Sequence, residues 1–174
     1  YLDRTSVSIS AERQYHSVTP NLDAAKLKNE VMMRWSPHLT LMGDFHSHPY
    51  RNLTEVNDEA GYNFSPEDLK ELKTNDFVWE QSGDNPVILV ITVCRLGRVR
   101  DSVQDNFRNN TARFAVGDFQ FWLNAAVGYL DADGKRVVTG NTNSDVHLSV
   151  EGWYYNEAGG RVRSASAVRP SRRG

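Results

Sequence analysis

The sequence predicts an α/β fold: a single domain in which a curved, mixed β-sheet is flanked by helices. Three observations indicate it. Residues 6–13 alternate apolar and polar side chains, as a half-buried strand does. Residues 24–35 place apolar side chains at spacings of three and four, which gives one stripe along a helix. Residues 86–96 form the most apolar run of the 174-residue chain, which is typical of a central strand buried on both faces.

The other elements follow in chain order. The first helix opens at Pro20-Asn21 and stops at Pro37, and a strand over residues 39–45 leads into two histidines. A second helix over residues 65–73 has Ser65 as its N-cap. The remaining predictions are a short strand at 77–80, a strand at 112–116, a strand or helix at 119–130, a turn at 131–134 returning as a strand at 135–138, and late strands or loops at 146–150 and 152–155.

Two histidines at the end of the predicted strand 39–45 are the feature of the sequence that says most about function. Successive side chains of a strand point to opposite faces, so His46 and His48 point the same way. Two imidazoles on one face can take two positions of a tetrahedral zinc ion, and a carboxylate from the following helix, Asp68, can take the third. A catalytic zinc keeps its fourth position for water. Asp44 shares this strand face, where it either hydrogen-bonds a ligand histidine or faces solvent.

At these residues the sequence resembles a known family. His-x-His-Pro at residues 46–49 followed by Ser-x-x-Asp at residues 65–68 is similar to the signature of the JAB/MPN+ (JAMM) zinc metalloproteases, and Gly-Asp-Phe-His-Ser-His-Pro resembles the prokaryotic JAB branch most. The resemblance covers roughly residues 7–93. It implies a JAB/MPN-like domain over residues 1–158 with Zn²⁺ as cofactor, held by His46, His48 and Asp68.

The resemblance also implies an activity and roles for two more residues. Zinc-bound water would attack a peptide or isopeptide bond at the C-terminus of a ubiquitin-like protein or sulfur carrier, and Ser65 would donate to the oxyanion. The family uses a Glu as general base, usually within a Gly-rich run ahead of the first strand, and no such run is present. The simplest interpretation is that the base precedes Tyr1, and Glu12 is the candidate within the chain.

One departure from the family pattern concerns the third ligand. Fifteen residues, 50–64, separate Pro49 from Ser65, about twice the usual spacing. Their polar composition predicts a loop insertion. Asp58 within this segment is the alternative to Asp68.

Two further functions remain open at this point. The first is a catalytically impaired JAB-fold module that binds a ubiquitin-like partner, which the missing general base favours. The second is a zinc amidohydrolase acting on a small amide. The retained ligand set argues against the binding module, because non-catalytic relatives tend to lose those ligands.

Composition and charge place the chain among globular proteins. Apolar content of 39% without a long apolar stretch predicts no membrane span. The only cysteine, Cys94, lies in the apolar run and predicts a buried thiol in a reducing, cytoplasmic setting.

Residues 159–174 contain five arginines and no acid, and we expect a flexible basic tail. The tail has no aromatic residue for base stacking, so a nucleic-acid partner is not expected.

Overall fold

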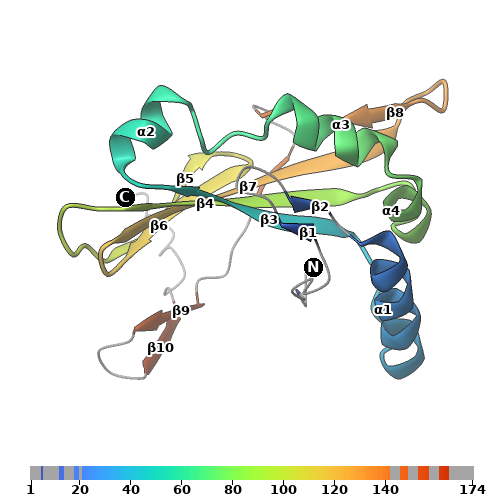
Figure 1. Cartoon of the computed structure of the whole chain (residues 1–174), viewed down its shortest axis with the longest axis horizontal. Helices are drawn as coiled ribbons and strands as arrows, with labels where there is room; N and C mark the ends of the chain where they lie inside the picture. The colour runs from blue at the N-terminus through green and yellow to red at the C-terminus, as the bar shows by residue number, and fades with distance from the viewer. Residues whose placement is uncertain are drawn as a thin grey trace, which may run out of the picture.

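A computed structural model gives the architecture of the chain (Figure 1). It describes residues 5, 12–13, 18–19, 21–141, 146–148, 153–156 and 161–164. The side chains of residues 12–13, 18–19, 103–106, 153–156 and 161–164 are outside this description. The predicted first strand, residues 6–13, therefore falls almost wholly outside the described residues.

A mixed β-sheet forms the centre of the molecule. Its strand order is β3-β4-β7-β6-β5, and β8 pairs with the far end of β7. The β3 and β4 strands are parallel, and the other neighbours are antiparallel. The strands are β3 (Gly43–Tyr50), β4 (Val87–Arg95), β5 (Ser102–Arg108), β6 (Thr111–Val116), β7 (Phe119–Leu130) and β8 (Arg136–Val138). This arrangement confirms the predicted α/β class with a mixed sheet.

The helices begin where the sequence offers capping side chains. They are α1 (Leu22–Trp35), α2 (Leu53–Asp58), α3 (Pro66–Thr74) and α4 (Asp76–Gln81). Asn21, Asn52, Ser65 and Asn75 cap them in that order, each accepting a hydrogen bond from the backbone N–H three residues ahead. The predicted helices at 21–35 and 65–73 are confirmed.

Two local predictions were wrong. Residues 77–80 belong to helix α4 and not to a strand, because Asn75 caps the turn and the neighbouring Val78 and Trp79 are both buried. The 50–64 segment is not simply a polar loop, because it contains α2, whose Val56 is fully buried.

One face of the sheet carries both described core clusters. The first joins α3 to the sheet through Leu72, Ile88, Val90 and Ala126, and the second joins α2 to it through Val56, Cys94 and Trp122. Figure 1 shows α2 and α3 together above this face. On β4, the residues of this face are buried, whereas Val87, Ile91 and Val93 on the opposite face are only half-buried. The predicted burial of this strand on both faces is therefore only partly correct.

Helix α1 points away from the sheet (Figure 1). Its predicted apolar stripe is exposed, with 62% of Leu27, 52% of Val31 and 80% of Trp35 accessible to solvent. Its buried residue is polar: Asn29 donates to Gln81 Oε1 at 2.7 Å. A second contact comes from Lys26, whose Nζ lies 6.0 Å from the centre of the Phe77 ring on α4. Both contacts involve polar side chains of the helix rather than its apolar stripe.

Four short strands complete the described residues. β1 (Glu12–Arg13) pairs with β2 (Val18–Thr19), and β9 (Trp153–Asn156) pairs with β10 (Arg161–Ser164). The β10 strand lies within the segment predicted to be a flexible tail, so that part of the tail pairs with β9. The remainder of residues 159–174 lies outside the described residues. Among the residues that the structure does describe, no helix combines the length and apolar character needed to cross a bilayer.

A glycine begins the strand that carries the histidines, and we predict that it cannot be replaced. A Cβ at Gly43 would overlap the backbone carbonyl of Val87 on β4. Gly43→Ala should therefore lower the free energy of unfolding by about 1–3 kcal/mol, the usual cost of overpacking. Chemical denaturation measures this. Gly97→Ala, where a Cβ would meet nothing within 4 Å, is the control, and equal losses in the two variants would contradict the prediction.

Candidate metal centre

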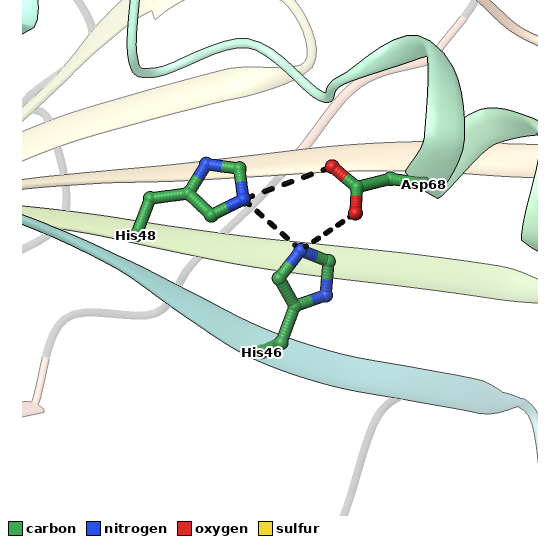
Figure 2. Close-up of side chains that lie close together, drawn as sticks. All are labelled: His46, His48 and Asp68. Carbon is green, nitrogen blue, oxygen red and sulfur yellow. Dashed lines mark hydrogen bonds and ion pairs between the residues drawn. The ribbon is translucent and has the colours of Figure 1, made fainter. Parts of the chain in front are cut away.

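His46 and His48 lie side by side on β3. The parallel pairing with β4 sets His46 opposite Val90 and His48 opposite Thr92, both fully buried. Both histidines point to the face that α3 covers (Figure 2). Their Nε2 atoms are 3.2 Å apart. The same-face placement predicted from strand alternation is confirmed, and Ser47 between them is exposed.

Asp68 comes to the histidines from the first turn of α3. Ser65 Oγ accepts a hydrogen bond from the backbone N–H of Asp68 at 3.1 Å, and Asp68 Oδ2 accepts one from the backbone N–H of Ser65 at 2.8 Å. This reciprocal pair is a capping box. It confirms Ser65 as the N-cap and fixes the carboxylate, whose Oδ1 lies 3.3 Å from His46 Nε2.

The three side chains form a group that could hold a metal ion. The two Nε2 atoms are 3.2 Å apart. His46 Nε2 lies 3.3 Å from Asp68 Oδ1, and His48 Nε2 lies 3.7 Å from the other oxygen, Oδ2. Ligands about 2.0–2.1 Å from a tetrahedral ion stand about 3.3 Å apart, which is close to these separations. Between 19% and 31% of each side chain is solvent-accessible, so the group is open to water on one side.

The electrostatics of the group suit metal coordination, which requires neutral imidazole and ionised carboxylate. Burial, followed by the charge of His46, lowers the pKa of His48, while Gly61 and Asp68 oppose this. Burial raises the pKa of Asp68, but hydrogen bonds from His46 and Ser65 outweigh burial and bring it to about 2. Near neutral pH, Asp68 is therefore an anion.

A backbone carbonyl orients the second histidine. His48 Nδ1 lies 3.3 Å from the Gly61 carbonyl oxygen, which also accepts a hydrogen bond from Thr92 Oγ1 at 2.8 Å. When Nδ1 carries the proton and donates to this oxygen, the lone pair of Nε2 faces His46 and Asp68. A Cβ at Gly61 would collide with the Tyr50 ring, so only glycine allows this close approach.

Two side-chain amides that the sequence did not indicate, the half-buried Asn141 and the buried Asn124, position the segment that leads into Ser65. Asn141 forms a bidentate pair with the backbone of Phe64: its Oδ1 accepts from Phe64 N at 2.6 Å and its Nδ2 donates to Phe64 O at 2.9 Å. Asn124, fully buried on β7, donates to Tyr62 O at 3.0 Å and accepts from Asn110 at 3.0 Å. These contacts span 62 and 77 residues of sequence, and no local signal indicates them.

Two further carboxylates lie near the group. Partial desolvation of Asp44 raises its pKa, and the charge of His46 opposes this. Desolvation also raises the pKa of Glu71, and the charges of Asp44 and Asp68 add to the effect. Asp44 is on the predicted strand face. Glu71 was not singled out from the sequence, although it follows Asp68 by three residues on α3 and so lies on the same side of that helix.

The other predicted site residues lie elsewhere. Asp58, the alternative third ligand, is an exposed residue at the C-terminal end of α2. The group of potential metal ligands found among the described residues contains Asp68 and not Asp58. Glu12 lies in β1 and its side chain is outside the described residues, so its role as general base stays a prediction.

Comparisons of the chain with protein-family models, with curated proteins and with solved structures found no match. The resemblance to the JAB/MPN+ family therefore depends on the motif residues alone.

We predict that Asp68, and not Asp58, contributes to metal binding. Asp68→Asn replaces an anionic ligand by a neutral amide and should weaken binding of a divalent metal by at least about 10–100-fold. A loss of that size is typical even when the mutated residue only hydrogen-bonds a metal ligand. Asp58→Asn should leave binding unchanged. Titration of both variants with zinc, followed calorimetrically, provides the comparison. Loss of binding with Asp58→Asn alone would reverse the assignment.

We also predict that Asn141 acts on the metal group from a distance. Asn141→Ala removes both bonds to Phe64, which frees the segment ahead of Ser65, and should lower metal affinity by about 10-fold or more. Asn85→Ala is the matched control, because Asn85 is exposed and bonds only locally to Gly83 O at 2.8 Å. Unchanged zinc affinity in Asn141→Ala would show that the capping box alone holds Asp68 in place.

Proposed function

We propose that this protein is a zinc-dependent peptidase or isopeptidase of the JAB/MPN+ kind, which cleaves the bond at the C-terminus of a ubiquitin-like protein or sulfur carrier. The observation that carries the proposal is the triangle of side chains His46, His48 and Asp68. Its two Nε2 atoms are 3.2 Å apart, and they lie 3.3 Å from Oδ1 and 3.7 Å from Oδ2 of the carboxylate, respectively. The family resemblance supplies the substrate class, and the triangle supplies the chemistry.

The donor set favours zinc over other common ions. Imidazole suits zinc and other transition metals, whereas calcium and magnesium prefer sites built entirely of oxygen. Two histidines and one carboxylate are the ligands of a known class of catalytic zinc sites, which keep a position open for water or substrate. Zinc bound there would lower the pKa of water and polarise an amide carbonyl. The partial exposure of all three side chains agrees with such an open site.

In this proposal Ser65 stabilises negative charge on the substrate. Its Oγ accepts the hydrogen bond from Asp68 N at 3.1 Å, and the hydroxyl proton is still available for donation. This contact keeps the hydroxyl close to the proposed ligand Asp68, so that it could donate to a carbonyl oxygen bound at the metal group. A donor of this kind is typically worth about 10²–10³-fold in rate.

The chain offers two candidates for the proton acceptor, beside a base that would precede Tyr1. Glu12 is the candidate from the sequence. Glu71 is the second: it lies on the same side of α3 as Asp68, and its charge interacts with His46, Asp44 and Asp68. We propose Glu71 for the role because one helical turn separates it from the potential ligand Asp68.

The compartment we propose is reducing and cytoplasmic. The single cysteine, Cys94, is a free thiol and is 1% exposed, and the chain therefore uses no internal disulfide.

The proposal predicts about one zinc per chain and zinc-dependent cleavage of a protein fused to the C-terminus of a ubiquitin-like domain. His48→Ala should abolish both, whereas His38→Ala, which removes an exposed histidine outside the metal group, should preserve both. Metal analysis and a gel-based cleavage assay measure these outcomes. Zinc binding without cleavage of any such fusion would contradict the enzymatic proposal and favour the binding module.

The same assay separates the two acids. Glu71→Gln should keep its zinc and lose about 10²–10⁴-fold in turnover, the usual contribution of a general base. Glu12→Gln should then have a smaller effect. The reverse result would return the role to Glu12.

A further inference from the structure

Helix α1 turns toward solvent the apolar stripe that a helix normally packs against its own domain. Leu27, Val31 and Trp35 follow one another at spacings of four residues, and each is more than half exposed. The helix itself points away from the sheet (Figure 1). Single exposed apolar residues are ordinary, but a continuous row of large ones marks a contact surface.

The rest of the domain contacts the other side of α1. Asn29 Nδ2 donates to Gln81 Oε1 of α4 at 2.7 Å. Lys26 Nζ lies 6.0 Å from the centre of the Phe77 ring, also on α4. With 3.6 residues per turn, Asn29 and Lys26 point roughly opposite to Val31. The attachment to α4 therefore directs the apolar stripe outward.

This attachment leaves α1 without the usual source of helix stability. Isolated helices shorter than about 12–15 residues are marginal in water, and packing of an amphipathic face supplies most of the stability of helices in proteins. The helix has 14 residues, and its buried residue is the polar Asn29. A partner that covers the stripe would supply the missing burial.

Two charges on one flank of the stripe indicate which partner fits. Asp23 in the first turn and Arg34 in the last turn are about three turns apart, so both lie on the same side of the helix. Neither side chain forms an ion pair within the part of the chain that the structure describes. In an antiparallel pair of α1 helices, Asp23 of each copy meets Arg34 of the other. A parallel pair would bring like charges together.

The size of the stripe suits a weak, reversible dimer. The exposed parts of Leu27, Val31 and Trp35 amount to roughly 400 Å² per copy, since a large side chain carries about 150–250 Å². Two copies would bury roughly 800 Å² of apolar surface, and about 1,000 Å² with the flanking side chains, which is the lower limit of specific interfaces. We expect a dissociation constant of about 10–100 µM for a contact of this size.

We propose that α1 mediates dimerisation of this protein. Two copies pair antiparallel about a two-fold axis, with Leu27 of each copy against Val31 of the other and Trp35 over the first turn of the partner helix. Such a pair is closed, because both copies use the same surface. A membrane fits the stripe less well, because Asp23 and Glu30 on its flank would be repelled by anionic lipids.

Sedimentation velocity of the whole chain between about 1 µM and about 500 µM measures the self-association. We expect monomers at the low end and dimers at the high end. Val31→Gln should weaken dimerisation at least about 10-fold, because it places an amide at the centre of the apolar contact. Val99→Gln is the matched control: Val99 is 74% exposed and lies between β4 and β5, so this variant should dimerise like the parent chain.

Charge reversals test the antiparallel arrangement. Asp23→Arg and Arg34→Asp should each weaken association about 3–10-fold, because each turns two attractive contacts into repulsive ones. An equimolar mixture of the two variants should form heterodimers about as stable as the parent dimer, because both flank contacts are again between opposite charges. A mixture that associates no better than either variant alone would overturn the pairing.

Three further outcomes would overturn the proposal. The first is a parent chain that stays monomeric over the whole concentration range, and the second is a dimer that Val31→Gln does not weaken. The third is a large drop in the thermal midpoint of monomeric Val31→Gln at about 1 µM, which would mean that the stripe packs within its own chain. The inference is independent of the metal group, so His48→Ala should dimerise like the parent chain.

Discussion

The hydrogen bonds between Ser65 and Asp68 determine both the start of α3 and the third corner of the metal group. The 2.8 Å bond from Ser65 N to Oδ2 leaves Oδ1 of the same carboxylate directed at His46. A cap is normally a local device worth about 1 kcal/mol. In this protein it also sets the position of a potential ligand, so any change that shifts the first turn of α3 moves the metal group as well.

The cap is itself supported by contacts from distant parts of the chain. Asn141 holds Phe64, the residue just before Ser65, and Asn124 holds Tyr62 from the floor of the sheet. A buried amide such as that of Asn124 is costly unless it is hydrogen-bonded, and the bonds of both asparagines go to the backbone of the segment between α2 and α3. The polar floor of the sheet thus keeps this segment in one conformation, and the segment in turn places Asp68 beside β3.

The electrostatic surroundings of the metal group are acidic. The carboxyl groups of Asp44, Asp68 and Glu71 all interact electrostatically with His46. Carboxylates gathered in this way suit a cation.

The sequence by itself determined the local features. Strand alternation put His46 and His48 on one face, and the apolar run 86–96 indicated β4. Helix-start signals at Pro20-Asn21 and at Ser65 located α1 and α3. Each of these features depends on neighbouring residues alone. Tertiary structure decided the rest. It selected Asp68 over Asp58, and it buried Trp79 in a helix where a four-residue window fits a strand equally well. It also made 119–130 a strand between β4 and β6, and it joined Asn141 to Phe64. These outcomes depend on contacts between residues far apart in the chain, which no local spacing records.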